Sequence, residues 1–305
     1  MRTIRIMRIL CIHRCRRAHY LWMSAAVGMA LAAALACRVP RNGAATTPVT
    51  TQSRAGTVAP AGAEVLAGIE WVRVAAPGGE LSAAVARPPG KGPFPVIVLL
   101  HGTHGFAREY VRLAHDLART SGVVAVAGCW FAGGQGEGRR FVTSIECPGA
   151  PAMPGAASDA VLDSVGALVA AAQDLPGVRR DRVALFGHSR GGGAALHYVR
   201  KRSGVRTAVL NSTGYPQDVI DHAGEVSAPL LMLHGTEDGN PADGGSDMSK
   251  VDRARAFEDA LRKAGKPVEA VYFDGGRHHG LFTNVAQYDD TVRRVAAFLR
   301  RRLAE

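Results

Sequence analysis

A serine flanked by glycines, between an apolar run and an alanine-rich segment, is the feature that most restricts how this chain can fold. Residues 182–186 (RVALF) are typical of a buried strand, and residues 191–202 have helical spacing. Between them lies Gly187-His188-Ser189-Arg190-Gly191. Glycines at such a turn let a strand and a helix approach closely, and the serine between them is held on strained backbone, clear of the sheet. The pattern predicts a strand–turn–helix unit of an α/β fold.

Strand-like and helix-like segments alternate along the chain from residue 69 onward. Residues 69–75 and 81–86 are short β-type runs around Pro77-Gly78-Gly79, which predicts a hairpin. The further predicted strands are 95–100, 123–127, 182–186, 207–211, 230–234 and 268–273, and the predicted helices are 110–120, 158–175, 191–202, 250–264 and 285–303. This order predicts one α/β domain over residues 69–305, with a mostly parallel central sheet of about eight strands flanked by helices on both faces.

Residues 1–36 have the organisation of an export signal. An arginine-rich stretch ends at Arg17, and the uncharged stretch 21–36 that follows is short for a membrane span. Small residues directly before Cys37 resemble a bacterial lipoprotein signal, in which the cysteine carries lipid. We therefore expect an exported protein, either lipid-anchored in the cell envelope through Cys37 or freely secreted, with an uncleaved anchor as a further alternative. Translation from Met7 or Met23 also stays open.

Residues 37–68 are rich in Ala, Thr, Pro, Gly and Ser and show no periodicity, which predicts a flexible linker. After a lipid-bearing Cys37, such a linker would hold the folded domain off a membrane. Two cysteines, Cys129 and Cys147, belong to the predicted domain. In an oxidising compartment we expect them to form a disulfide, and two separate buried thiols are the alternative.

Composition excludes several classes of protein. The chain is 47% hydrophobic and 21% charged, which is ordinary for a globular protein and argues against disorder. The net charge of +11 falls largely on the N-terminal signal and on arginines 293–302 of the last predicted helix. Because no nucleic-acid-binding motif accompanies this charge, we expect no nucleic-acid partner.

Acidic residues and histidines follow two later strands, in the order that a serine nucleophile requires. A serine is a weak nucleophile, and it needs a base that a third group orients. The strand 230–234 is followed by Asp238, which we expect to be the orienting acid. Glu237 and Asp243 are the less favoured acids. The strand 268–273 leads into a glycine-rich loop with His278 and His279, either of which could be the base.

The loop after the strand 95–100 carries the other groups that serine chemistry needs. Its sequence, His101-Gly102-Thr103-His104-Gly105, lets the backbone approach a substrate oxygen closely. We expect the backbone N–H groups of Thr103 and Arg190 to form an oxyanion hole. His101 and His188 are expected to be local hydrogen-bonding supports. Side chains just beyond the strand ends are expected to line an apolar substrate pocket: His104, Phe106, Trp130, Phe131 and Tyr215.

Four motifs together carry a family resemblance: LLHG at 99–102, GHSRGG at 187–192, LHGTED at 233–238 and HHGLF at 278–282. The region from about 69 to 303 resembles the α/β-hydrolase superfamily, and within it the dienelactone-hydrolase-like bacterial serine esterases. GHSRGG is also similar to chlorophyllase-like and secreted polyester- or lipid-hydrolysing members. The resemblance implies a Ser-His-Asp triad with no metal and no organic cofactor, and it selects His279 as the base. Dienelactone hydrolases use a cysteine where this chain has Ser189, so the resemblance does not extend to their substrate.

The expected activity is hydrolysis of carboxylic esters through Ser189, His279 and Asp238, with a small-molecule ester as the partner. A peptidase or an acyltransferase would use the same triad. A non-catalytic binding module on this fold is an alternative from another class. The pattern lacks H-E-x-x-H and paired C-x-x-C motifs, so we expect no catalytic metal. The sequence leaves the oligomeric state and the natural ester open.

Overall fold

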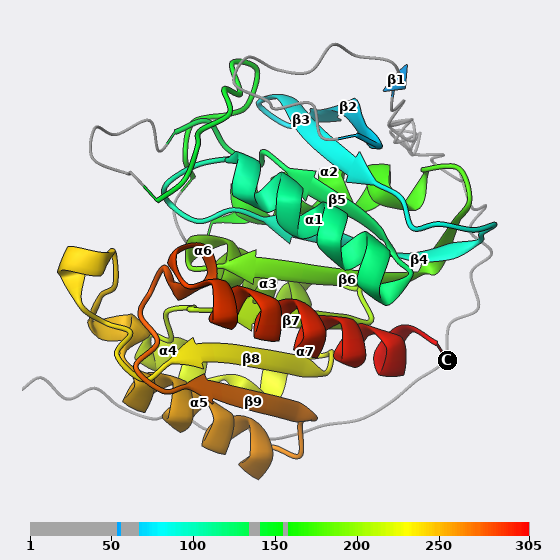
Figure 1. Cartoon of the computed structure of the whole chain (residues 1–305). Coiled ribbons are helices and arrows are strands. Elements are labelled where there is room, and N and C mark those ends of the chain that lie inside the picture. Colours follow the sequence, from blue (N-terminus) through cyan, green and yellow to red (C-terminus); the bar gives the residue numbers. More distant parts are fainter. Residues whose placement is uncertain (1–53, 56–66, 134–140, 155–157, 305) are drawn as a thin grey trace, which may run out of the picture. The chain divides into compact units, whose positions relative to one another are not determined.

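One sheet of nine strands organises the described part of the chain (Figure 1). The computed structural model describes residues 54–55, 67–133, 141–154 and 158–304. The strands are β1 (Arg54–Ala55), β2 (Ile69–Ala76), β3 (Gly79–Ala86), β4 (Phe94–Leu100), β5 (Val124–Gly128), β6 (Val178–His188), β7 (Thr207–Asn211), β8 (Leu230–Gly235) and β9 (Val268–Phe273). Their order in the sheet is β1-β2-β3-β5-β4-β6-β7-β8-β9.

The sheet is antiparallel at its first edge and parallel through the rest. β2 and β3 form the predicted hairpin, and β3 pairs antiparallel with β5. From β5 across β4, β6, β7 and β8 to β9, every neighbouring pair is parallel. The carboxyl ends of these parallel strands therefore meet at one edge of the sheet, where open α/β folds place their functional groups.

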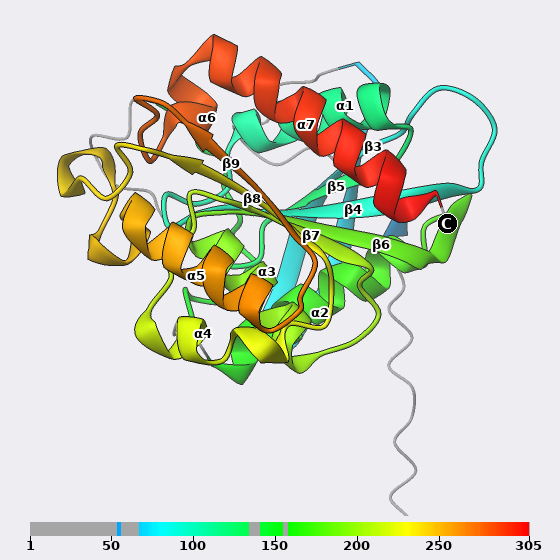
Figure 2. The same cartoon turned by 90° about the horizontal axis from the view of Figure 1, so that it is seen from below.

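Helices cover both faces of the sheet, as predicted (Figure 2). The longer ones are α1 (Arg108–Ser121), α2 (Asp159–Gln173), α3 (Arg190–Lys201), α5 (Val251–Lys263) and α7 (Val285–Leu303). Two short ones are α4 (Gln217–Asp221) and α6 (Gly280–Thr283), and 3-10 turns lie at Ala223–Glu225, Pro241–Asp243 and Asp247–Ser249. Helices α1 and α7 pack on one face, and α2, α3 and α5 pack on the other.

β4 is apolar along its whole length, and both faces of its last five residues are buried. In β4, Val96 and Val98 point into the core beneath α2 and α3, whereas Ile97 and Leu99 point into the core beneath α1 and α7. All four side chains are buried. This two-sided burial explains the continuous apolar run that predicted the strand.

The described residues before position 69 bear on the expected domain boundaries. The chain divides into units at 1–48 and 49–305, and every described residue belongs to the second. The expected signal 1–36 and Cys37 lie outside the described residues. Arg54–Ala55 fall inside the stretch 37–68 expected to be a flexible linker, yet they pair with β2 as β1. The outer edge of a strand offers unpaired backbone groups, and this pairing satisfies some of them. No helix among the described residues is long and apolar enough to cross a membrane.

Candidate active site

Ser189 lies on the sharp turn between β6 and α3, with φ at 53°. A non-glycine residue in this region is strained, and such strain persists only where the surroundings enforce it. A Cβ at Gly187 would collide with the backbone of Gly191, and a Cβ at Gly191 would collide with the carbonyl oxygen of Leu100. The Ser189 N–H donates to the Asn211 carbonyl at 2.8 Å. The two glycines and this hydrogen bond hold the hydroxyl at the carboxyl end of the sheet.

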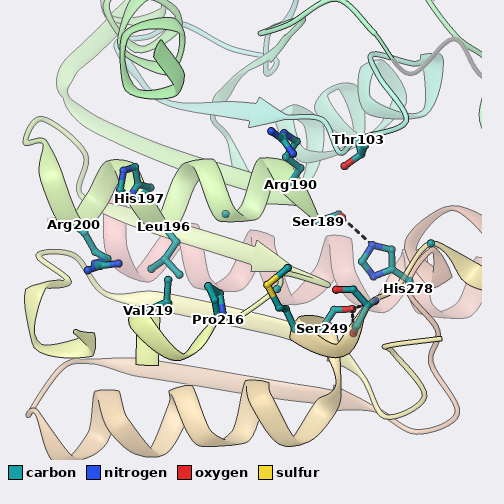
Figure 3. A pocket seen from close by; sticks show the side chains of 15 residues that line it. Thr103, Ser189, Arg190, Leu196, His197, Arg200, Pro216, Val219, Ser249 and His278 are labelled. Atoms are coloured by element: carbon teal, nitrogen blue, oxygen red, sulfur yellow. Dashed lines mark hydrogen bonds between the residues drawn. The ribbon is translucent and has the colours of Figure 1, made fainter. Parts of the chain in front are cut away.

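His278 joins Ser189 to Asp238 (Figure 3). Its Nε2 lies 2.8 Å from Ser189 Oγ, and its Nδ1 lies 2.8 Å from Asp238 Oδ1. The chain order Ser, Asp, His is the expected one. The histidine is not the expected one, because His278 and not His279 makes both hydrogen bonds.

The position of His278 is fixed by hydrogen bonds between the loops that follow β8 and β9. The Thr236 N–H donates to the Phe273 carbonyl, and the Glu237 N–H donates to the Gly276 carbonyl, each at 2.9 Å. A Cβ at Gly235 would collide with the backbone of Gly276. The two loops therefore run in direct backbone contact, which brings His278 opposite Asp238.

His279 lines a cavity with Ser189, but His278 makes the hydrogen bond to the serine hydroxyl. His279 is the residue directly before α6, and its ring stacks on Phe141 with 3.9 Å between centroids. Adjacent residues at the start of a helix point their side chains in different directions. A difference of one position along the chain therefore decides whether His278 or His279 bonds to the serine. Ligand nitrogens of His279, His104 and His188 lie within 4.8 Å of one another, and in the described part of the chain these three are the residues that could hold a metal ion.

Asp238 is buried, with 5% of its surface exposed. Burial opposes its ionisation, but the hydrogen bond and charge of His278, with a contribution from His234, lower the pKa of Asp238 below its ordinary value. His234 Nε2 lies 3.6 Å from Asp238 Oδ2 and 2.7 Å from the Ser249 carbonyl oxygen. Asp238 is therefore held as a carboxylate beside the imidazole.

The two less favoured acids lie elsewhere. Arg277 pairs with Glu237 at 3.4 Å and with Asp243 at 3.6 Å, on the exposed side of the same loops. Neither carboxylate is hydrogen-bonded to His278. Their geometry supports a role in holding the loops together.

Thr103 and Arg190 flank the serine on the side away from His278 (Figure 3). Arg190 is the first residue of α3, where backbone N–H groups have no carbonyl of the same helix to bind. The loop that carries Thr103 is held by Tyr110, whose hydroxyl accepts the Gly102 N–H at 2.9 Å. Both residues line the cavity beside Ser189, and their role in an oxyanion hole stays a prediction.

A cavity of about 350 Å³ opens beside Ser189 and His278. Its wall is mostly apolar and includes Leu196, Pro216, Val219 and Met248 (Figure 3). Arg200 lies at the far end, but it pairs with Glu225 at 2.7 Å, which neutralises its charge. The cavity therefore suits an uncharged group.

The aromatic residues expected to line this cavity do not line it. Trp130 and Tyr215 are fully buried in the core on the α2–α3 side, and Tyr215 stacks on Phe257. Phe106 and Phe131 line a separate cavity beside the disulfide. The correction has a simple cause: large aromatic side chains beyond strand ends turn inward to bury apolar surface, and residues 214–219 and 244–249 form the wall instead.

His104 is the one member of the expected pocket that lies near the serine. It lines a second cavity of about 600 Å³ shared with Ser189, His278 and His279.

His188 donates from Nδ1 to Asn211 Oδ1 at 2.7 Å, the supporting role expected of it. Burial lowers the pKa of His101 to about 4 and that of His188 well below 6.5, so both are neutral at pH 7.

Cys129 and Cys147 form the expected disulfide. It closes a stretch of chain 18 positions long, which contains Phe141 and carries it against His279. Both sulfur-bearing residues are buried. The bond therefore constrains one rim of the second cavity.

The fold and the site geometry agree with a family model described as the dienelactone hydrolase family, which matches residues 81–299. The chain belongs to the dienelactone hydrolase family. The match begins within β3 and ends within α7, so it contains all the strands from β4 to β9 and every residue of the site. Among curated proteins, no sequence matches the chain significantly.

Solved structures share the fold of this dienelactone hydrolase family member at low identity. A candidate dienelactone hydrolase from Klebsiella pneumoniae has 18% identity and a TM-score of 0.59, over 78% of this chain and 99% of the other. An esterase from Pyrococcus furiosus has 15% identity and a TM-score of 0.60, over 77% and 93%. A dienelactone hydrolase-like promiscuous phosphotriesterase from metagenomic libraries has 17% identity and a TM-score of 0.59, over 77% and 98%.

Proposed function

We propose that this protein is a serine hydrolase that cleaves carboxylic esters with Ser189 as the nucleophile, His278 as the base and Asp238 as the orienting acid. The observation that carries the proposal is the continuous hydrogen-bond chain from Ser189 Oγ through His278 to Asp238, with 2.8 Å at each step. Membership of the dienelactone hydrolase family supports ester hydrolysis as the reaction class.

Acylation begins when Ser189 Oγ attacks the ester carbonyl and His278 Nε2 takes the serine proton. The imidazolium that forms is stabilised by the buried Asp238 carboxylate on Nδ1. The same proton then passes from His278 to the leaving alcohol, and an acyl-enzyme remains on Ser189. Water activated by His278 releases the acid and restores the serine.

The negative charge on the substrate oxygen needs donors that are already in place before the reaction. The backbone N–H groups of Thr103 and Arg190 are suited to this role, because both residues flank Ser189 in the wall of the cavity. Arg190 adds the favourable field of an α-helix N-terminus. Its guanidinium is turned away and donates to the Pro154 carbonyl.

The substrate class follows from the cavity beside the serine. A volume of about 350 Å³ with an apolar wall accommodates the acyl group of a small or medium ester. The pairing of Arg200 with Glu225 disfavours an anionic acyl end. We therefore expect neutral aliphatic or aromatic acyl esters as substrates.

Export is the second part of the proposal. The signal-like residues 1–36 and the small residues before Cys37 favour a protein of the cell envelope, tethered by lipid on Cys37, or a secreted one. The disulfide between Cys129 and Cys147 is in accord with an oxidising compartment. A labelled-lipid incorporation assay on the wild type and Cys37→Ser separates tethering from secretion.

Labelling with a fluorophosphonate probe tests the serine chemistry. The wild type is expected to be labelled and to hydrolyse p-nitrophenyl esters, and Ser189→Ala is expected to lose both properties. Hydrolysis of peptides but not esters would favour a peptidase, and transfer to an added alcohol would favour an acyltransferase. A folded wild type that is neither labelled nor active on any ester would favour a binding module and contradict the proposal.

A further inference from the structure

Three histidines near Ser189 lie together and take no direct part in the proposed hydrolysis. The ring centroids of His104, His188 and His279 are 5.6 Å apart in each of the three pairs. One ligand nitrogen from each lies within 4.8 Å of the others. The histidines come from the loop after β4, the end of β6 and the loop after β9, so the fold itself brings them together.

His188 supplies the second observation. Its side chain is fully buried, and its Nε2 has no hydrogen-bond partner among the described residues. Asn211 Oδ1 accepts from its Nδ1 at 2.7 Å, which places the proton on Nδ1 and the lone pair on Nε2. An imidazole fixed in this way by an outer hydrogen bond is the usual form of a metal-ligating histidine.

The rings of the other two histidines are also held in place. Tyr110 Oη lies 2.9 Å from His104 Nε2, which leaves the Nδ1 side of that ring next to Gly102. A Cβ at Gly102 would lie 3.2 Å from atoms of both His104 and His188, so the glycine permits the close approach of the two rings. His279 stacks on Phe141.

We propose that His104, His188 and His279 form a binding site for a divalent transition cation of the zinc type, in the wall of the cavity that also contains Ser189. Neutral imidazole is a preferred ligand of Zn²⁺, Cu²⁺ and Ni²⁺, whereas Mg²⁺ and Ca²⁺ require oxygen ligands.

The geometry fits a tetrahedral ion after a small adjustment. With Zn–N bonds of about 2.0–2.1 Å, three imidazole nitrogens lie roughly 3.3 Å apart. The present separations are up to 4.8 Å, so binding requires the rings to turn inward from their present positions. Because His104 and His279 line the cavity of about 600 Å³, the cation can enter from that side, and the fourth ligand position is open to water.

Isothermal titration of the metal-free protein with Zn²⁺ tests the proposal. The wild type is expected to bind one equivalent, and His104→Gln and His279→Gln are each expected to bind at least tenfold more weakly. His222→Gln is the matched control, because His222 is exposed, lies between α4 and the 3-10 turn Ala223–Glu225, and is not a member of the cluster. Mg²⁺ is expected to produce no binding heat.

The catalytic histidine is the main competing site, and His278→Gln decides between the two. Unchanged Zn²⁺ affinity in His278→Gln supports the three-histidine site, whereas loss of binding in this variant overturns it. Unchanged affinity in both His104→Gln and His279→Gln also overturns it. If these variants do not fold, the visible spectrum of wild-type protein with Co²⁺ serves instead: tetrahedral nitrogen ligation supports the site, and the spectrum of aqueous Co²⁺ contradicts it. These readouts do not depend on the proposed hydrolase activity.

Discussion

His278 and Asp238 are 40 positions apart in the chain, yet Nδ1 of the histidine lies 2.8 Å from Oδ1 of the aspartate. This hydrogen bond keeps the proton on Nδ1 and directs the lone pair of Nε2 towards Ser189 Oγ. The orientation of the proposed base therefore depends on a residue in the loop that follows β8.

Replacing Asp238 by Asn should lower kcat for a p-nitrophenyl ester by about 10⁴-fold, because the amide favours the wrong tautomer of His278. Steady-state kinetics measures the change. Glu237→Gln and Asp243→Asn are the controls, and each should change kcat by less than threefold, since both carboxylates pair with Arg277. Loss of activity in Asp243→Asn with retention in Asp238→Asn would move the acid to position 243.

The two adjacent histidines should behave differently when each is replaced by Gln. His278→Gln removes the base and should lower kcat by at least about 10³-fold. His279→Gln removes a ring that stacks on Phe141 and should lower kcat by less than tenfold. Parallel kinetics of the two variants measures the difference. The reverse order of effects would restore His279 as the base.

Stability should decrease as the pH falls from about 6.5 towards 4. Burial lowers the pKa of His101 to about 4 in the folded state, against about 6.5 in the unfolded state, so the unfolded chain binds the proton first. Between pH 7.5 and pH 5 this one group should remove about 2 kcal/mol of the free energy of unfolding. Urea unfolding at the two pH values measures the loss. In His101→Gln the difference between the two pH values should shrink by a similar amount, and an unchanged difference would contradict the assignment.

The cavity beside Ser189 should become shorter when Val219 is replaced by a larger residue. Val219→Trp places a large ring in the apolar wall and should lower kcat/KM for p-nitrophenyl octanoate at least tenfold more than for the acetate. Met153→Trp, at an exposed position outside the cavity, is the matched control and should not change the ratio. Equal losses for both esters in Val219→Trp would place the acyl chain elsewhere.

The disulfide should contribute about 3 kcal/mol to the free energy of unfolding, as expected for a closed loop of this length. Urea unfolding of Cys129→Ser/Cys147→Ser, compared with the wild type, measures the contribution. Dithiothreitol should lower the wild-type midpoint and leave that of the double variant unchanged. A midpoint equally sensitive to reductant in both proteins would show that another effect is responsible.

Strong periodicity made most of the fold predictable. The predicted helix 285–303 coincides with α7 because its apolar positions repeat with a helical period, and the predicted strand 207–211 coincides with β7 because it is a short run of buried residues. β6 begins at Val178, four residues before the predicted start, because its first residues are polar and partly exposed. β1 was predicted as linker because two residues are too few to show a period.

Ser189 and Asp238 could be selected from the sequence because each follows a recognisable strand directly. The choice between His278 and His279 depends on backbone contacts with Thr236 and Glu237, which no local pattern records. The cavity wall was unpredictable for a similar reason. Val219 lies in α4 and Met248 in the 3-10 turn Asp247–Ser249, and these segments meet only in the folded chain. Trp130 and Tyr215 are large apolar side chains and are buried in the core.

β9 is the last strand of the sheet in the described part of the chain, and its residues are only half buried. The nucleophile rises from the centre of the sheet, whereas the general base follows this outermost strand. Local unfolding of β9 would separate the proposed base from the serine while the core stayed folded. We therefore expect heat or denaturant to abolish activity through local opening at this edge before the whole domain unfolds.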